Sequence, residues 1–176
     1  TAMTSFTAQN LGAGRYDRIK KGTLQCMVVM GVIVLCGVGL GMLLTVNDLY
    51  FHVFLSADKV TAETVRFGNA LLYVDFAMYP FLGGVFLIRN CVQGIGRPSF
   101  VLGAGAAELV ARIAVCLLLP AAVAGGMVSA SASPLAFYAL CAADPMAWIA
   151  ADAVLCIPLI RNIMRMDYRY LRSGQI

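Results

Sequence analysis

The stretch Leu24–Val46, LQCMVVMGVIVLCGVGLGMLLTV, decides the fold. Its 23 residues carry no charge, and a helix that crosses a lipid bilayer needs about 20 mostly apolar residues. The run is too long for a strand, and alternation of apolar and polar side chains is absent. The stretch therefore predicts a membrane-spanning helix over residues 24–46.

Three further apolar runs follow along the chain. The second contains one charge, Asp75, the third contains Glu108 and Arg112, and the fourth contains Asp152. The fourth run can be extended upstream to Leu135, with a break at Pro145. We predict an all-α polytopic membrane protein with about four transmembrane helices, at residues 24–46, 67–90, 98–122 and 145–163. A tail is expected at residues 164–176. Residues 58–66 are expected to form a short surface helix before the second crossing.

Composition supports the membrane class. The chain is 61% hydrophobic and 12% charged, whereas soluble domains carry about 25% charged residues. Its six cysteines and single histidine show no paired ligand spacing, so we expect neither a metal site nor a cofactor. Ser/His pairs and His/Glu zinc spacings are also missing, which argues against an enzyme.

The basic residues predict the orientation of the chain. Ten of the 13 lie on one predicted side, two on the other and one, Arg112, inside the membrane. Because cytoplasmic loops carry an excess of Lys and Arg, both ends are expected in the cytoplasm. The net charge of +4 is then a signal of topology, and a nucleic-acid partner is not expected. The acidic residues expected on the outer side are Asp48, Asp58, Glu63 and Asp144.

Two glycine-containing stretches test the nucleotide-binding alternative. QNLGAGRYDRIKKG (Gln9–Gly22) and QGIGRPS (Gln93–Ser99) each place two glycines one residue apart. A dinucleotide loop needs a third glycine, but Asp17 and Ser99 occupy that place. We interpret both stretches as cytoplasmic turns that use positive φ. The candidate turn residues are Gln9, Gly12, Gly14, Arg89, Asn90, Gln93, Gly94 and Gly96, with Arg89 and Arg97 as anchors at the lipid headgroups.

Other glycines and one proline lie inside the apolar runs. The pair Gly37 and Gly41 and the pair Gly83 and Gly84 allow close helix packing. Pro80 removes one backbone hydrogen bond and is expected to kink the second helix.

Four motifs, in order, resemble those of the MATE (multidrug and toxic compound extrusion) transporters. They are TAQNLGAGRYDRIKKG, FLIRNCVQGIGRPS, AELVARI and DPMAWIAAD. The resemblance implies helices nine to twelve of a twelve-helix, two-lobe protein, with the end of helix eight at residues 1–9. It also implies a cation-coupled antiporter of the plasma membrane, driven by protons or sodium, that exports amphipathic, often cationic compounds. The partners would be the lipid bilayer, those compounds and the remaining N-terminal helices of the same transporter.

The ionisable residues inside the runs are the candidate ion- or substrate-binding groups. A charged side chain near the bilayer centre costs roughly 2.5–3.5 kcal/mol, so Asp75 must be protonated, paired or ion-bound. Tyr79 is one turn on and shares its face. Glu108 and Arg112 are four residues apart and can pair. Asp152 lies four residues after Trp148 and completes the set: Asp75, Tyr79, Glu108, Arg112 and Asp152.

Each candidate also has a structural interpretation. Asp75 could be a protonated group that hydrogen-bonds a neighbouring helix, and Glu108 with Arg112 could be a pair that fixes packing. Two alternatives for the whole chain stay open as well: a flippase for lipid-linked precursors, and a small membrane scaffold protein without transport. The flippase would favour several basic residues inside the membrane, and only Arg112 qualifies.

Overall fold

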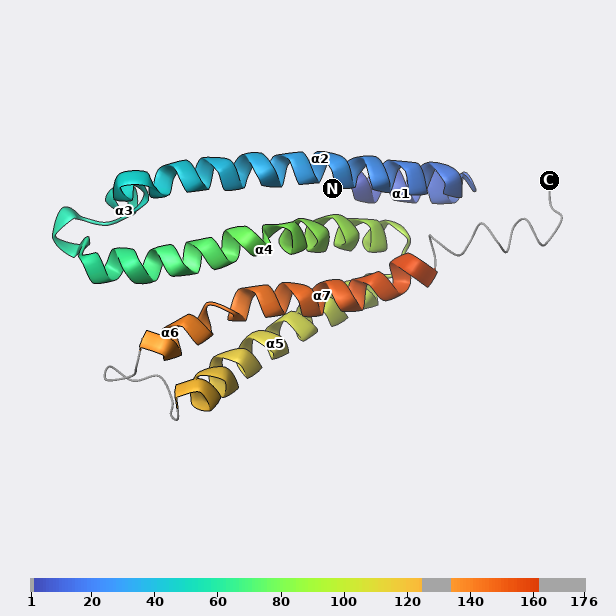
Figure 1. Cartoon of the computed structure of the whole chain (residues 1–176). Coiled ribbons are helices and arrows are strands. Elements are labelled where there is room, and N and C mark those ends of the chain that lie inside the picture. Colours follow the sequence, from blue (N-terminus) through green and yellow to red (C-terminus); the bar gives the residue numbers. More distant parts are fainter. Residues whose placement is uncertain (1, 125–133, 162–176) are drawn as a thin grey trace.

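The computed structural model describes residues 2–124 and 134–161. Every regular element within these ranges is helical, which confirms the all-α prediction. The elements are α1 (Ala2–Gly12), α2 (Tyr16–Thr45), η1 (Val46–Asp48), α3 (Leu49–Phe54), η2 (Ala57–Lys59), α4 (Ala62–Gly94), α5 (Pro98–Ala124), α6 (Pro134–Leu140) and α7 (Ala143–Leu159) (Figure 1). The predicted tail at residues 164–176 lies outside the described residues.

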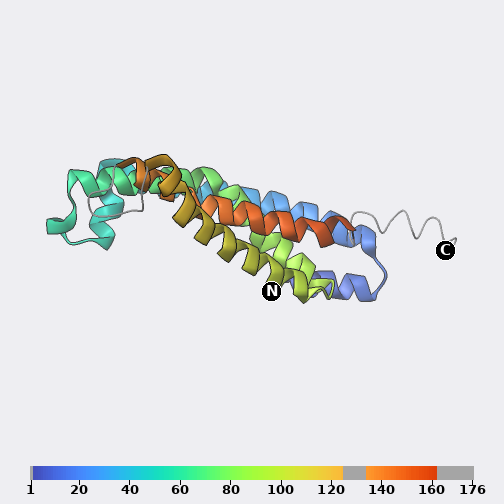
Figure 2. The same ribbon diagram turned by 90° about the horizontal axis from the view of Figure 1, so that it is seen from below.

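Four stretches are long and apolar enough to cross a membrane. They are Tyr16–Thr45, Ala62–Gly94, Pro98–Val123 and Pro134–Leu159. The last joins α6 and α7 across a short turn. Figure 2 shows the four stretches lying along one elongated bundle, as expected for a multi-pass membrane protein.

The helix α4 is longer than its apolar run. It begins at Ala62, where Thr61 caps it by accepting a hydrogen bond from the Thr64 backbone N–H at 3.1 Å. The predicted separate helix over residues 58–66 is therefore wrong: the one-turn helix η2 ends at Lys59, and the polar residues after Thr61 already belong to α4. The helix also continues through Pro80 to Gly94.

The helix α7 occupies the centre of the packing. It lies against both α4 and α5, whereas α4 and α5 meet each other at few places (Figure 1). Most of the core comes from α4 and α7, including Val85, Cys91, Ala151 and Leu155, all of which are buried. This arrangement places the charged residues of α4 and α5 next to those of α7.

The helix α2 presents a broad apolar surface. Leu24, Val28, Leu35 and Leu43 are each more than 60% exposed. Such a surface suits lipid or further transmembrane helices, since exposed contiguous apolar patches of this kind are rare on soluble proteins.

Two glycine positions allow close contact between helices. A Cβ added at Gly94 would lie 2.7 Å from the Thr4 carbonyl oxygen, so α1 approaches the end of α4 closely. A Cβ at Gly41 would meet the Phe76 ring, which confirms close packing there. Gly37 was predicted to act together with Gly41. A Cβ at Gly37 would meet nothing within 4 Å, so no other described helix packs closely against this glycine.

Candidate functional site

The candidate site begins at the turn between α6 and α7. The helix breaks at Cys141 and Ala142, four residues before the predicted break at Pro145, which instead lies in the first turn of α7. Asp144 also lies in that first turn, inside the stretch Pro134–Leu159. It is ten residues after Pro134, about 15 Å along the span. Asp144, predicted for the outer side, thus lies inside a stretch that is long and apolar enough to cross a membrane.

Arg112 joins α5 to this turn. Its Nε donates to Asp144 Oδ1 at 2.8 Å, and its Nη2 donates to Glu108 Oε1 at 3.4 Å. The expected pair of Glu108 and Arg112 on one helical face therefore forms. Asp144 of α7 is a further partner of Arg112 and comes from a different helix.

Glu108 also has a second partner. Its Oε2 accepts from Arg89 Nη2 of α4 at 3.1 Å. Arg89 lies within α4, five residues before its end, and its side chain reaches inward to α5. The prediction of Arg89 as a headgroup anchor at the turn is wrong, because the helix extends past it and the intramembrane carboxylate of Glu108 binds it.

Asp152 of α7 rests against Gly84 of α4. A Cβ added at Gly84 would lie 2.9 Å from Asp152 Oδ2 and 3.3 Å from Oδ1, so only glycine leaves room for this carboxylate. Asp152 Oδ1 is buried and has no hydrogen-bond partner among the described residues. Arg89 is the basic group that acts on it electrostatically.

Asp75 also lies on α4, nine residues before Gly84. Its Oδ1 is likewise buried, with no hydrogen-bond partner in the described part of the chain. Asp144, in the first turn of α7, is the carboxylate whose charge acts on it. One helical turn later, the Tyr79 ring packs on Trp148 of α7, with ring centroids 6.1 Å apart.

These residues form one group that we call the charged cluster. Its members are Asp75, Arg89, Glu108, Arg112, Asp144 and Asp152. Four carboxylates face two guanidinium groups, so the cluster carries two negative charges when every group is ionised. The ion pairs engage Glu108 and Asp144, which leaves Asp75 and Asp152 as the two carboxylates that a cation or a proton would neutralise.

Sequence reasoning identified Asp75, Tyr79, Glu108, Arg112 and Asp152 as candidates. It did not assign Gly84, Arg89 and Asp144 to the site. Asp144, Trp148 and Asp152 are spaced by four residues and share a face of α7, a helical signal that could have placed Asp144 inside the membrane. The contact between Gly84 and Asp152 left no such signal, because it joins residues 68 positions apart.

The two turns predicted around the paired glycines are shorter than expected. Gly14 and Gly96 adopt positive φ values of 67° and 75°, which confirms their role in tight turns. Gln9 and Gly12 lie in α1, and Asn90, Gln93 and Gly94 lie in α4. These five are helical, and Asn90 accepts a hydrogen bond from Thr4 Oγ1 at 2.9 Å that links α4 to α1.

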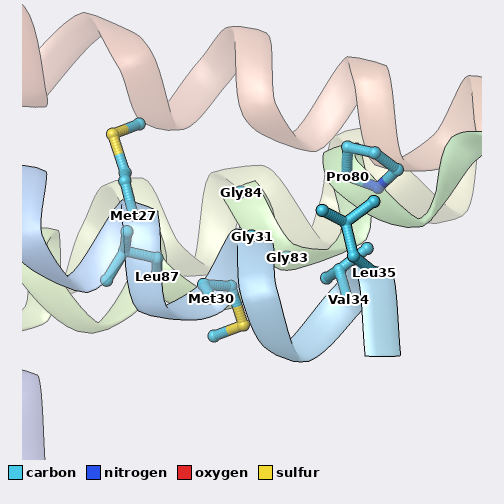
Figure 3. A pocket seen from close by; sticks show the side chains of 9 residues that line it. All are labelled: Met27, Met30, Gly31, Val34, Leu35, Pro80, Gly83, Gly84 and Leu87. Atoms are coloured by element: carbon cyan, nitrogen blue, oxygen red, sulfur yellow. The ribbon is translucent and has the colours of Figure 1, made fainter. Parts of the chain in front are cut away.

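An apolar groove of about 320 Å³ runs between α2 and α4. Figure 3 shows its walls, with Met30 and Gly31 on α2 and Pro80 and Gly83 on α4. Gly84 also lines it, so the groove begins next to the glycine on which Asp152 rests. No group of three potential metal ligands occurs within residues 2–124 and 134–161.

Long apolar helices with ionisable groups held between them define a multi-pass membrane protein. The sequence profile of the MatE family matches residues 1–118. The chain therefore belongs to the MatE family, whose members are membrane transporters of the multidrug and toxic compound extrusion type rather than enzymes. No curated protein and no solved structure matches it.

The matched residues cover part of the charged cluster. They include α1 to α4 and most of α5, and so Asp75, Arg89, Glu108 and Arg112. Asp144 and Asp152 on α6–α7 lie beyond the match, and only the structure joins them to the other four.

Proposed function

We propose that this chain is part of a cation-coupled antiporter that exports amphipathic, often cationic compounds. Protons or sodium ions entering the cell would drive export by alternating access between two lobes. The chain would supply helices of the C-terminal lobe, work with the remaining N-terminal helices, and lie in the plasma membrane with both ends in the cytoplasm. It would need no cofactor, catalyse no reaction and bind no nucleic acid.

The observation that carries this proposal is the pair Asp75 and Asp152. Each has a buried carboxylate oxygen without a hydrogen-bond partner among the described residues. An uncompensated carboxylate in a bilayer is costly, so a cation or proton that neutralises it binds with a favourable free energy. A site whose occupancy differs between two arrangements of the protein can then bias one of them.

The groove between α2 and α4 supports the proposed substrate class. Its walls are apolar, and Asp152 lies just beyond Gly84 at its edge. An apolar surface beside a carboxylate suits a compound with an apolar body and a positive charge. A flippase for lipid-linked pyrophosphates would instead favour spare cations, whereas Arg89 and Arg112 are both engaged by carboxylates.

The proposal predicts transport that depends on an ion gradient. Proteoliposomes that contain the complete transporter should move ethidium, an amphipathic organic cation, when an inward gradient of protons or sodium is imposed. Collapse of the gradient with an ionophore should reduce the rate to that of protein-free vesicles. Ethidium transport that continues unchanged without any ion gradient would contradict the proposal.

A further inference from the structure

Arg89 uses only part of its hydrogen-bonding capacity. Its Nη2 donates to Glu108, whereas its Nε is buried and has no acceptor among the described residues. A guanidinium group carries five donors in a fixed planar fork. Arg89 is therefore able to bind a second carboxylate or to exchange one carboxylate for another.

Asp152 is the complementary acceptor on the facing helix. Its Oδ1 is buried without a donor in the described part of the chain, and Arg89 already acts on it electrostatically. Both residues lie in the same half of the bundle: Arg89 is about 7.5 Å from the end of α4 and Asp152 about 10 Å from the end of α7, at a rise of about 1.5 Å per residue. Among the described residues, Cys156 lies one turn later on α7 and is also acted on by the charge of Asp152.

We propose that Asp152 is the alternative partner of Arg89. Arg89 binds Glu108 of α5, as observed, when Asp152 is neutralised, and turns to Asp152 of α7 when that carboxylate is free. Because α4 and α5 meet at few places, loss of the pair between Arg89 and Glu108 removes one of the side-chain contacts that hold α4 to α5. The inference rests on the proposed function only for the identity of the neutralising agent, which is the coupling cation.

Gly84 makes this exchange geometrically possible. It leaves the space in which the Asp152 carboxylate rests against α4, five residues before Arg89 on the same helix. Alanine at this position would displace the carboxylate. Gly84 is thus a positioning residue for Asp152, and Gly105 of α5 offers a matched control, since a Cβ there would meet nothing within 4 Å.

Thermal unfolding of the complete protein in detergent micelles tests the exchange. The set comprises the parent, Glu108→Gln, Asp152→Asn and the double variant. Each single variant should lower the unfolding midpoint only slightly, because Arg89 keeps one carboxylate. The double variant should lower it by at least about 3 °C more than the sum of the singles. Additive shifts would overturn the proposal.

Two further comparisons keep the test decisive if the double variant fails to fold. Replacing Arg89 as well, in Arg89→Gln/Glu108→Gln/Asp152→Asn, should restore folding, because it removes a cation that has lost both partners. A triple variant no better than the double would overturn the proposal. In the Glu108→Gln background, Gly84→Ala should act like Asp152→Asn, and Gly105→Ala should have little effect.

The same variants separate this inference from the proposed function. Unfolding midpoints do not depend on transport, so coupled shifts without ion-driven transport would contradict only the proposed function. Additive shifts in a protein that does transport would contradict only the exchange of Arg89.

Discussion

Replacement of Asp75 by Asn should abolish ion-driven transport by the complete transporter. The substitution keeps the size of the side chain and removes the charge that binds a cation. The carboxylate lies in the middle of α4 with one buried oxygen unpaired among the described residues. If it takes up the coupling ion, the gradient can no longer bias the two arrangements of the protein. We expect the initial rate of ethidium transport to fall at least about tenfold, which corresponds to a rise of about 1.4 kcal/mol in the activation free energy.

The control for this experiment is Asp58→Asn. Asp58 is an exposed carboxylate of η2, outside the four spanning stretches, and its replacement should leave transport unchanged. Equal amounts of folded protein in the vesicles must be verified by size-exclusion chromatography. Full ion-driven transport by Asp75→Asn would remove this residue from the mechanism.

Replacement of Arg112 by Gln should strongly destabilise the folded protein. Arg112 is the cation between Glu108 and Asp144, and its loss leaves Asp144 without its 2.8 Å partner inside the membrane. Breaking a buried ion pair by removing one partner costs about 3–5 kcal/mol. Because the Arg112 and Asp144 side chains are 38% and 44% exposed, we expect a loss below that range, about 1–2 kcal/mol. Unfolding in mixed micelles of increasing denaturing detergent measures it.

The matched control is Arg97→Gln in the turn between α4 and α5. Arg97 is exposed, and surface substitutions of this kind usually change stability by less than about 0.5 kcal/mol. Removal of the opposing charge in Arg112→Gln/Asp144→Asn should recover part of the lost stability, because no unpaired carboxylate then remains at the α6–α7 turn. Equal stability of Arg112→Gln and Arg97→Gln would contradict a structural ion pair.

The membrane-spanning architecture could be predicted from the sequence because the bilayer imposes it. Long uncharged runs such as Leu24–Val46 have few other stable structures. The local pair of Glu108 and Arg112 could also be predicted, since helical spacing alone brings residues four apart together. Both results depend on neighbours in the chain and not on the arrangement of the helices.

Helix ends were harder to predict, because apolar composition marks the segment inside the bilayer and not the whole helix. Thr61 caps α4, and the first turns of the helix contain Glu63 and Arg66, which are polar but continue the helix from its cap. The same extension carries α4 past Arg89 to Gly94. Arg89, which was predicted as an anchor in the turn, therefore lies inside α4 and faces Glu108.

The contacts between helices could not be derived from a single sequence. Arg89 with Glu108, Arg112 with Asp144 and Gly84 with Asp152 each join different helices. The spacing of residues along one helix specifies a face but not which helix covers that face. These three contacts join ionisable residues of different helices into the charged cluster. Within it, Asp75 and Asp152 are the two carboxylates that the ion pairs do not engage.

Infrared difference spectroscopy tests most directly whether Asp75 and Asp152 take up the coupling cation. Spectra of the complete protein in lipid would be recorded on addition of sodium ions at fixed pH, and again on a change of pH without sodium. We predict that carboxyl bands change on cation binding in the parent and in Asp58→Asn. The change should be weaker in Asp75→Asn and in Asp152→Asn, and it should be absent in the double variant. Unchanged carboxyl bands in Asp75→Asn/Asp152→Asn would contradict the assignment.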